Sequence, residues 1–237
     1  MPPDELKDFR RALVVVAHPD DAEFGCAGTV ALWTDRGVEV TYVVCTDGAS
    51  GAGDPTLGQQ GLVAVRQAEQ REAAKVLGVR EVVFLGHPDG GLRPSEELRL
   101  ELVRLIRRHR PDRLVCQNAV RHYGNVYGNH PDHLAAGQAA LEALYPYSRN
   151  RFAYPHLLDE GLEPHVVREV LVAGTEAPDY FVEVSESLER KLEALACHRS
   201  QQRPGDDVSV WVRRRLAQAG EPHGMAFAES FRRIDSG

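Results

Sequence analysis

The stretch RALVVVAHPDDAEFGCAG (residues 11–28) organises the fold, because an apolar run passes through a polar turn into a helical segment. Residues 11–17 are rich in Val and do not alternate with polar residues, which is typical of a β-strand buried on both faces. Residues 22–36 predict a helix that Gly37 closes. A buried strand followed directly by a helix is the first half of a β-α-β unit.

The same alternation of apolar strands and helical segments continues along the chain. Strands joined by helical crossovers form a parallel sheet with helices on both faces. The sequence therefore predicts an α/β fold with a Rossmann-like, mostly parallel sheet, and a single domain over residues 1–237, since no linker or internal repeat interrupts it. The predicted strands are 38–46, 81–85, 112–117, 168–174 and 180–184, and the predicted helices are 62–77, 96–109, 131–145, 185–198 and 208–234.

Charge, apolar run length and cysteine content indicate which partners and which cellular location to expect. The 237 residues hold 28 Lys and Arg against 35 Asp and Glu, a formal net charge of −7, whereas a nucleic-acid-binding protein needs a basic face. The longest apolar run, residues 12–17, is far shorter than the roughly 20 residues that cross a bilayer. The N-terminus has no apolar signal core, and the four cysteines form no C-x-x-C motif. We expect a cytoplasmic protein with no nucleic-acid partner and no stable membrane insertion, and the sequence leaves a homo-oligomer open.

Polar residues follow the first predicted strand, at the position where open parallel sheets bind their ligands. His18, Asp20 and Asp21 lie directly after this strand. His18 and Asp21 are three residues apart at the start of a helix, so both side chains can turn toward one point. Imidazole and carboxylate groups are good ligands for zinc and similar divalent ions.

A second cluster, His130, Asp132 and His133, marks the start of the helix after the fourth predicted strand. The first and fourth strands flank the switch point of a doubly wound sheet, so the two clusters can meet in space. Together they offer three metal ligands and spare acid–base groups, the pattern of a catalytic rather than a structural zinc site. The alternative is that each cluster only caps a helix, because Asp in a first turn stabilises the helix dipole without a metal.

The motifs His18-Pro19-Asp20-Asp21 and His130-Pro131-Asp132-His133 resemble those of the PIG-L/LmbE-like zinc-dependent deacetylases. This resemblance implies an LmbE-like fold and a hydrolase that removes an acetyl group from an N-acetylated amino sugar, such as a small molecule containing N-acetylglucosamine, or from a related small amide. The resemblance extends to EFGCAGT (23–29), VRQAEQREAAKVLG (65–78), LGHPDGGL (85–92) and residues 191–201.

The resemblance also implies a zinc cofactor and roles for eight side chains. Bound zinc polarises an amide carbonyl and acidifies water. Fe(II), Co(II) or Mn(II) could occupy the same nitrogen and oxygen ligands. By resemblance, His18, Asp21 and His133 hold the zinc, Asp20 is the general base, His130 stabilises the oxyanion or protonates the leaving amine, Asp132 orients one of these imidazoles, and Arg66 and Asp89 bind the substrate.

Three other functions remain open from the residues. A non-catalytic nucleotide- or sugar-binding Rossmann-like module would carry a glycine fingerprint after the first strand, where this chain has Asp20 and Asp21. A metallo-phosphoesterase with two metals would need more bridging carboxylates. The third is a metal-dependent amidase that acts on a thiol conjugate. At the substrate contacts, Arg66 could instead form a surface ion pair with Glu69, and Asp89 could be a turn residue.

Several residues outside the two motifs carry structural expectations. The three arginines at 213–215 are expected to form a solvated helix face. Trp211 is expected to cover a contact between helix and sheet. His198 could line the pocket or be a buried hydrogen-bonded histidine, and the role of Glu229 is open. The glycine-rich segment 47–61 could be a lid over the site or a surface loop.

Overall fold

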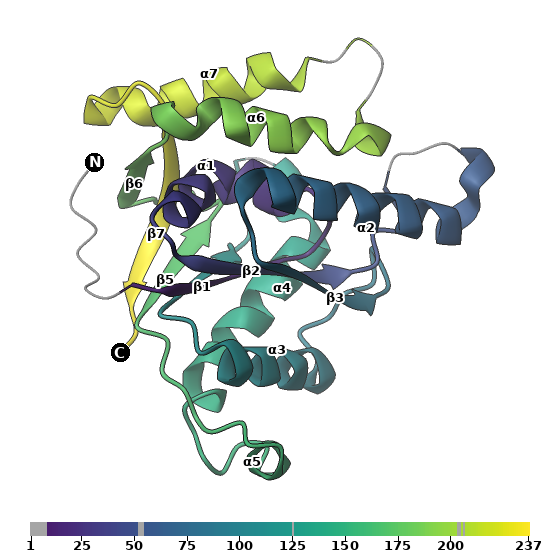
Figure 1. The fold of residues 1–237 in the computed structure, drawn as a ribbon, viewed down its shortest axis with the longest axis vertical. Helices are drawn as coiled ribbons and strands as arrows, with labels where there is room; N and C mark the ends of the chain where they lie inside the picture. Colours follow the sequence, from purple (N-terminus) through teal and green to yellow (C-terminus); the bar gives the residue numbers. More distant parts are fainter. Residues whose placement is uncertain (1–8, 52–54, 125, 203–204, 206) are drawn as a thin grey trace.

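The structure, a computed structural model, describes residues 9–51, 55–124, 126–202, 205 and 207–237. Most of the N-terminal segment and part of the loop at 47–61 thus lie outside the described residues. The strands are β1 (Arg11–Val16), β2 (Glu39–Thr46), β3 (Glu81–His87), β4 (Arg113–Gln117), β5 (Glu169–Ala173), β6 (Tyr180–Glu183) and β7 (Ala228–Asp235). They form one sheet in the order β3-β2-β1-β4-β5-β7-β6 (Figure 1). The first five strands are parallel, and β7 runs antiparallel between β5 and β6.

Helices cover both faces of this sheet. On one face lie α1 (Asp21–Asp35), α2 (Gly58–Leu77), α6 (Leu188–Ala196) and α7 (Val208–Gly220), and on the other lie α3 (Glu96–His109) and α4 (Pro131–Glu142) (Figure 1). A single-turn helix, α5 (His156–Asp159), stands beyond α3, away from the sheet. The predicted α/β fold with helices on both faces of a mostly parallel sheet is confirmed.

The central strand β1 separates two apolar cores. Because side chains alternate along a strand, Leu13 and Val15 face α3 and α4, whereas Val14 and Val16 face α1 and its neighbours. All four side chains are buried. The continuous Val-rich run in the sequence is therefore the consequence of burial on both faces.

The C-terminal tail is where the predicted elements are wrong. The sequence predicts a helix over residues 208–234, but α7 ends at Gly220 and the chain returns as β7. This segment pairs with β5 on one side and β6 on the other, and it buries Phe231 while it exposes Arg232. Strand pairing across distant parts of the chain outweighs the local helix propensity here.

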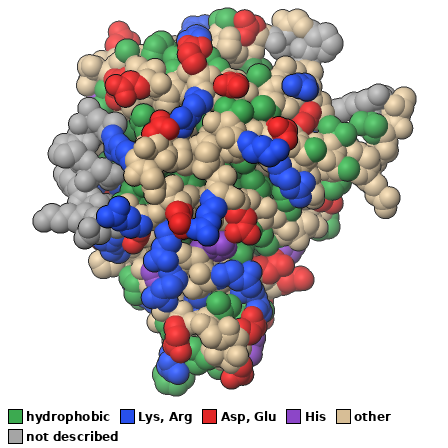
Figure 2. Space-filling view, viewed as in Figure 1, with side chains coloured by type: hydrophobic (Ala, Val, Ile, Leu, Met, Phe, Trp, Pro, Cys, Tyr) green, Lys and Arg blue, Asp and Glu red, His purple; other side chains and the backbone are tan. Residues whose placement is uncertain are grey.

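The exterior carries charges of both signs. Figure 2 shows Lys and Arg side chains interspersed with Asp and Glu side chains over the face that it draws. Exposed ion pairs such as Lys75 with Glu72 contribute little, because solvent screens them. In the part of the chain that the structure describes, no helix has the length and apolar character needed to cross a bilayer.

The contact between α4 and the end of β4 gives a test of the fold. A Cβ at Gly137 would collide with the backbone carbonyl of Gln117, so Gly137→Ala is expected to lower the free energy of unfolding by at least about 2 kcal/mol. Gly25→Ala in α1 is the control, because its Cβ would meet only Ala173, at 3.8 Å. Urea denaturation measures both, and equal stability of the two variants would contradict this packing.

Candidate metal centre

The site lies where the segments after β1 and β4 leave the same edge of the sheet. These two strands are adjacent and parallel, with Val15 beside Cys116. The backbone N–H of Ala17 donates to Oε1 of Gln117 over 2.9 Å, which ties the two segments together beyond the ladder. The two His/Asp clusters, 18–21 and 130–133, therefore meet, although they are more than a hundred residues apart in the sequence.

Three donor groups converge at this junction. His18 Nδ1 lies 3.3 Å from His133 Nε2 and 3.3 Å from Asp21 Oδ2, and Asp21 Oδ1 lies 3.1 Å from His133 Nε2. Two ligand atoms bound tetrahedrally at the usual zinc distances lie about 3.3 Å apart. The donor set His18, Asp21 and His133 therefore fits one tetrahedral divalent ion in both ligand type and spacing.

The opposite ring nitrogen of His18 faces two other carboxylates. His18 Nε2 lies 3.1 Å from Asp132 Oδ2 and 3.2 Å from Asp89 Oδ1. Asp132 is fully buried and accepts the backbone N–H groups of Gly90 and Leu92. A metal-binding imidazole commonly donates its second N–H to such a fixed carboxylate, which holds the ring and its tautomer.

The charge around His18 favours a bound cation. Burial acts against the charged imidazole, but the carboxylates of Asp21, Asp89 and Asp132 raise the pKa of His18 to about 9. Desolvation acts against the charged carboxylate of Asp21, but the nearby imidazoles of His133 and His18 outweigh it and hold the pKa of Asp21 well below its usual range. Three carboxylates around one ring concentrate negative charge, which a divalent cation would offset.

His130 stands at the rim of the centre. Its Nδ1 accepts the backbone N–H of Asp132 over 3.2 Å and so caps α4. This bond places the ring proton on Nε2, with the ring 4.7 Å from that of His18 and 5.0 Å from that of His133. Partial burial and the two neighbouring imidazoles lower the pKa of His130, so the neutral ring is favoured.

Asp20 has a left-handed backbone, with φ of 93°, in the turn between β1 and α1. Gln70 on α2 holds this unusual conformation, because its Oε1 accepts the backbone N–H of Asp20 over 2.9 Å. Burial, with the neighbouring charge of Asp21, raises the pKa of Asp20 to about 7. A carboxylate with such a pKa beside a metal centre has the properties of a general base.

Arg66 and Asp89 form a wall beside Asp20. Arg66 is buried and donates to the backbone carbonyls of Pro19, at 2.7 Å, and Gly48, at 3.0 Å. Asp89 Oδ2 lies 3.7 Å from Arg66 Nη1. The alternative of a surface ion pair between Arg66 and Glu69 is wrong. Binding of substrate by Arg66 and Asp89 stays a prediction.

A buried polar network behind the site was not predicted as a unit. Glu23 accepts a hydrogen bond from Gln70 at 2.9 Å and pairs with His198 at 3.2 Å. Burial disfavours the charged imidazole, but the hydrogen bond and charge of Glu23 outweigh it and raise the pKa of His198. Of the two alternatives from the sequence, a pocket-lining residue or a buried hydrogen-bonded histidine, His198 is the second. Gln70 follows Arg66 by four residues on one helix, a spacing that could have indicated a shared face.

Lys191 and Glu229 hold the first turns of α1. The Lys191 ammonium donates to the carbonyls of Glu23 and Phe24 and to Glu229, over 2.7–3.0 Å. The Glu229 carboxylate also accepts the backbone N–H groups of Gly28 and Thr29. Both side chains are buried, so this pair links α6 and β7 to the helix that carries Asp21.

Comparisons with known proteins identify relatives of this arrangement. The family described as "PIG-L: GlcNAc-PI de-N-acetylase" matches residues 13–144, which include both His/Asp clusters. "Diacetylchitobiose deacetylase" from Thermococcus kodakarensis is 32% identical over 97% of this chain and 85% of that protein. "Probable N-acetyl-alpha-D-glucosaminyl L-malate deacetylase 2" from Bacillus anthracis is 32% identical over 83% of each chain. The solved structure of N,N'-diacetylchitobiose deacetylase from Pyrococcus horikoshii has a TM-score of 0.90 at 32% identity, over 97% of this chain and 85% of that one.

The buried ion pair can be tested by stability. Lys191→Met leaves the Glu229 carboxylate buried without its cation and is expected to lower the free energy of unfolding by about 3–5 kcal/mol. Lys191→Met combined with Glu229→Gln removes both charges and should recover part of the loss. Urea denaturation of the single and double variants measures the coupling, and simple additivity of the two changes would argue against it.

Proposed function

This chain belongs to the PIG-L family of GlcNAc-PI de-N-acetylases and is a deacetylase, and on that premise we propose that it releases acetate from an N-acetylated amino sugar with the help of a zinc ion. The observation that supports this most directly is the convergence of His18 Nδ1, His133 Nε2 and the Asp21 carboxylate within 3.1–3.3 Å of one another. Two imidazoles and one carboxylate suit zinc and leave one tetrahedral position for water or substrate.

The residues around the donor set have distinct parts in the reaction. The zinc ion, when bound, polarises the amide carbonyl and acidifies water. Asp20 accepts the proton of the attacking water at a carboxylate oxygen. His130 faces the site with Nε2–H, from which the neutral ring donates a hydrogen bond to the developing oxyanion. Its alternative role, transfer of a proton to the leaving amine, would require the imidazolium form, in which Nδ1 no longer accepts the Asp132 N–H. Asp132 holds the ring of His18.

The proposed substrate is a small molecule that contains N-acetylglucosamine. The relative from Thermococcus kodakarensis carries the name of a diacetylchitobiose deacetylase. Sugar hydroxyls are good partners for buried charged groups, and Arg66 and Asp89 line the side of the centre that carries Asp20. A thiol conjugate with an amide bond is the alternative substrate.

We also propose that the whole chain acts as one domain in the cytoplasm. The seven strands described above belong to one sheet. Cys26, Cys45 and Cys116 are buried free thiols, and Cys197 is a free thiol as well, which suits a reducing compartment.

Asp20→Asn tests the general base. The amide cannot accept the proton, so we expect the rate of acetate release from N,N'-diacetylchitobiose to fall about 100-fold or more, with metal content unchanged. Asp159→Asn is the matched control, because Asp159 is exposed on α5, far from the site in the fold. Full activity of Asp20→Asn would remove the assigned role.

His133→Ala tests the metal. Loss of one of three ligands is expected to abolish stoichiometric zinc in the purified protein, measured by atomic emission, together with acetate release. His156→Ala, at an exposed histidine, should keep both. In the wild type a chelator should stop acetate release and zinc should restore it, while activity that survives complete removal of the metal would contradict the proposal.

A further inference from the structure

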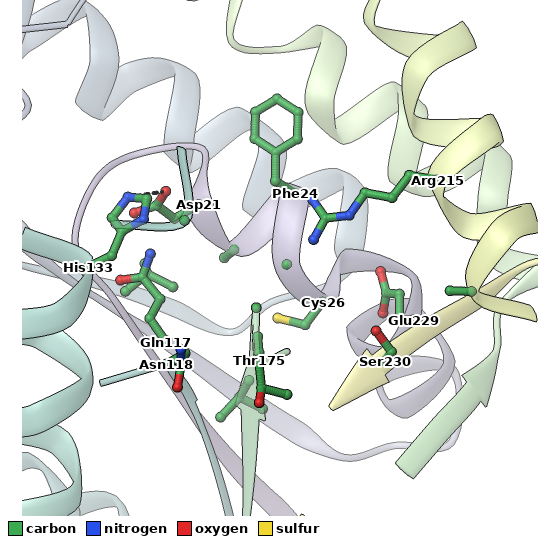
Figure 3. A pocket seen from close by; sticks show the side chains of 18 of the residues that line it. Asp21, Phe24, Cys26, Gln117, Asn118, His133, Thr175, Arg215, Glu229 and Ser230 are labelled. Atoms are coloured by element: carbon green, nitrogen blue, oxygen red, sulfur yellow. Dashed lines mark ion pairs between the residues drawn. The ribbon is translucent and has the colours of Figure 1, made fainter. Parts of the chain in front are cut away.

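A pocket of about 670 Å³ opens beside the metal centre. It lies between α1 and α7, over the carboxyl ends of β4 and β5. Asp21 and His133 line one end, but neither Asp20 nor Arg66 lines it. Figure 3 shows Asp21 and His133 on one side of this space and Arg215 on the other. The volume is in the range that holds a small ligand.

The outer wall of the pocket is apolar. Phe24 lies one helical turn after Asp21 and contacts Trp211 edge to face, with ring centroids 6.0 Å apart. Val212 and Leu216 continue this wall along α7. Trp211 is 52% exposed, so the expectation that it covers a contact between helix and sheet is wrong. The wall is therefore apolar but partly open to solvent at Phe24 and Trp211.

Most charged side chains that line the pocket have a partner of opposite charge, and Arg215 is the exception among the described residues. Lys191 and Glu229 neutralise each other at 2.7 Å, and Glu176 pairs with His122 at 3.1 Å. Asp21 belongs to the donor set. Arg215 has no hydrogen bond or ion pair with any side chain that the structure describes, and it stacks near Trp211 at 5.3 Å.

Arg215 differs in this respect from the arginines beside it. Arg213 pairs with Glu189 at 2.7 Å, and Arg214 is exposed and does not line the pocket. The guanidinium of Arg215 instead extends from α7 toward α1 (Figure 3). Arg215 is exposed, as a solvated arginine face predicts, but it also lines the pocket, whereas Arg214 does not.

We propose that this pocket is a second arm of the active site, in which Arg215 binds an anionic group, a carboxylate or a phosphate, carried by the amide substrate. The proposal rests on the proposed hydrolysis of an amide at the metal centre. The two substituents of an amide leave the breaking bond in different directions, and this pocket, which Arg66 does not line, offers room for one of them. A guanidinium matches two oxygens of either anion in a bidentate contact.

The anion could come from either side of the scissile bond, and two ligands separate these sources. N-acetylglucosamine 1-phosphate carries it on the sugar, and N-succinylglucosamine carries it on the acyl chain. With N-acetylglucosamine as the neutral reference, KM and kcat for the three substrates are measured with zinc-loaded enzyme. We expect one of the two anionic substrates to have a KM at least 10-fold below that of N-acetylglucosamine, and the substrate with the lower KM identifies the side that enters the pocket.

Arg215→Gln should raise the KM of the favoured anionic substrate about 10- to 100-fold, because a charge-assisted hydrogen bond is lost. Arg215→Lys should retain part of the preference. Arg214→Gln, the adjacent exposed arginine, is the matched control and should retain all of it. Equal KM values for all three substrates, or equal effects of the two glutamine variants, would overturn the inference.

Binding without turnover separates this inference from the proposed function. Glucosamine 1-phosphate and succinate are the corresponding products, and Trp211 next to Arg215 reports their binding by fluorescence. Binding of one of them that Arg215→Gln weakens and Arg214→Gln does not supports the anion site, even if no substrate is hydrolysed and the proposed function fails. Turnover of N-acetylglucosamine with no such binding overturns the anion site alone.

Discussion

The parallel pairing of β1 with β4 is the constraint on which the candidate site depends. Because Val15 lies beside Cys116, the segments that follow these strands start from neighbouring points at one edge of the sheet. His18 and His133 are 115 residues apart, yet their ring nitrogens approach to 3.3 Å. His18 lies two residues after β1, whereas His133 lies in the first turn of α4, which residues 118–130 connect to the end of β4.

Buried charge behind the site fits a role in positioning rather than in stability. Each ion of a buried pair costs several kcal/mol to remove from water, and apolar residues of equal volume often stabilise a fold as well. A pair of apolar side chains could not form hydrogen bonds with the backbone. Lys191 donates to carbonyl groups, and Glu229 accepts from N–H groups, in the first turns of α1. The same turns follow Asp20, whose left-handed backbone is held by Gln70. A strained conformation of this kind persists only where its surroundings fix it.

The sequence was sufficient where structure depends on near neighbours. The first six strands, most helices and the two His/Asp motifs follow from local patterns. A His and an Asp three residues apart at a helix start, for example, face one point whatever surrounds them. The residues that support those motifs depend on contacts between distant parts of the chain. Lys191, for example, donates to the carbonyl of Glu23, 168 residues away. For the same reason β7 was predicted as a helix, since its identity comes from pairing with β5 and β6. Which side chains of α7 face the sheet and which face solvent also depends on the pairing of β7 with β5 and β6.

Arg66 and Arg215 show how structural and binding roles differ. Arg66 is compensated in place: two backbone carbonyls accept its N–H groups, and the carboxylates of Asp20 and Asp89 lie within 3.7 Å. Its charge stabilises the turn that holds Asp20, with or without a ligand. Arg215 is exposed and forms no hydrogen bond or ion pair with a described side chain, although its guanidinium lies over the ring of Trp211 and the charge of Glu229 acts on it. If Arg215 binds an anion as proposed, then Arg215, rather than the buried Arg66, is the position at which charge selects the substrate.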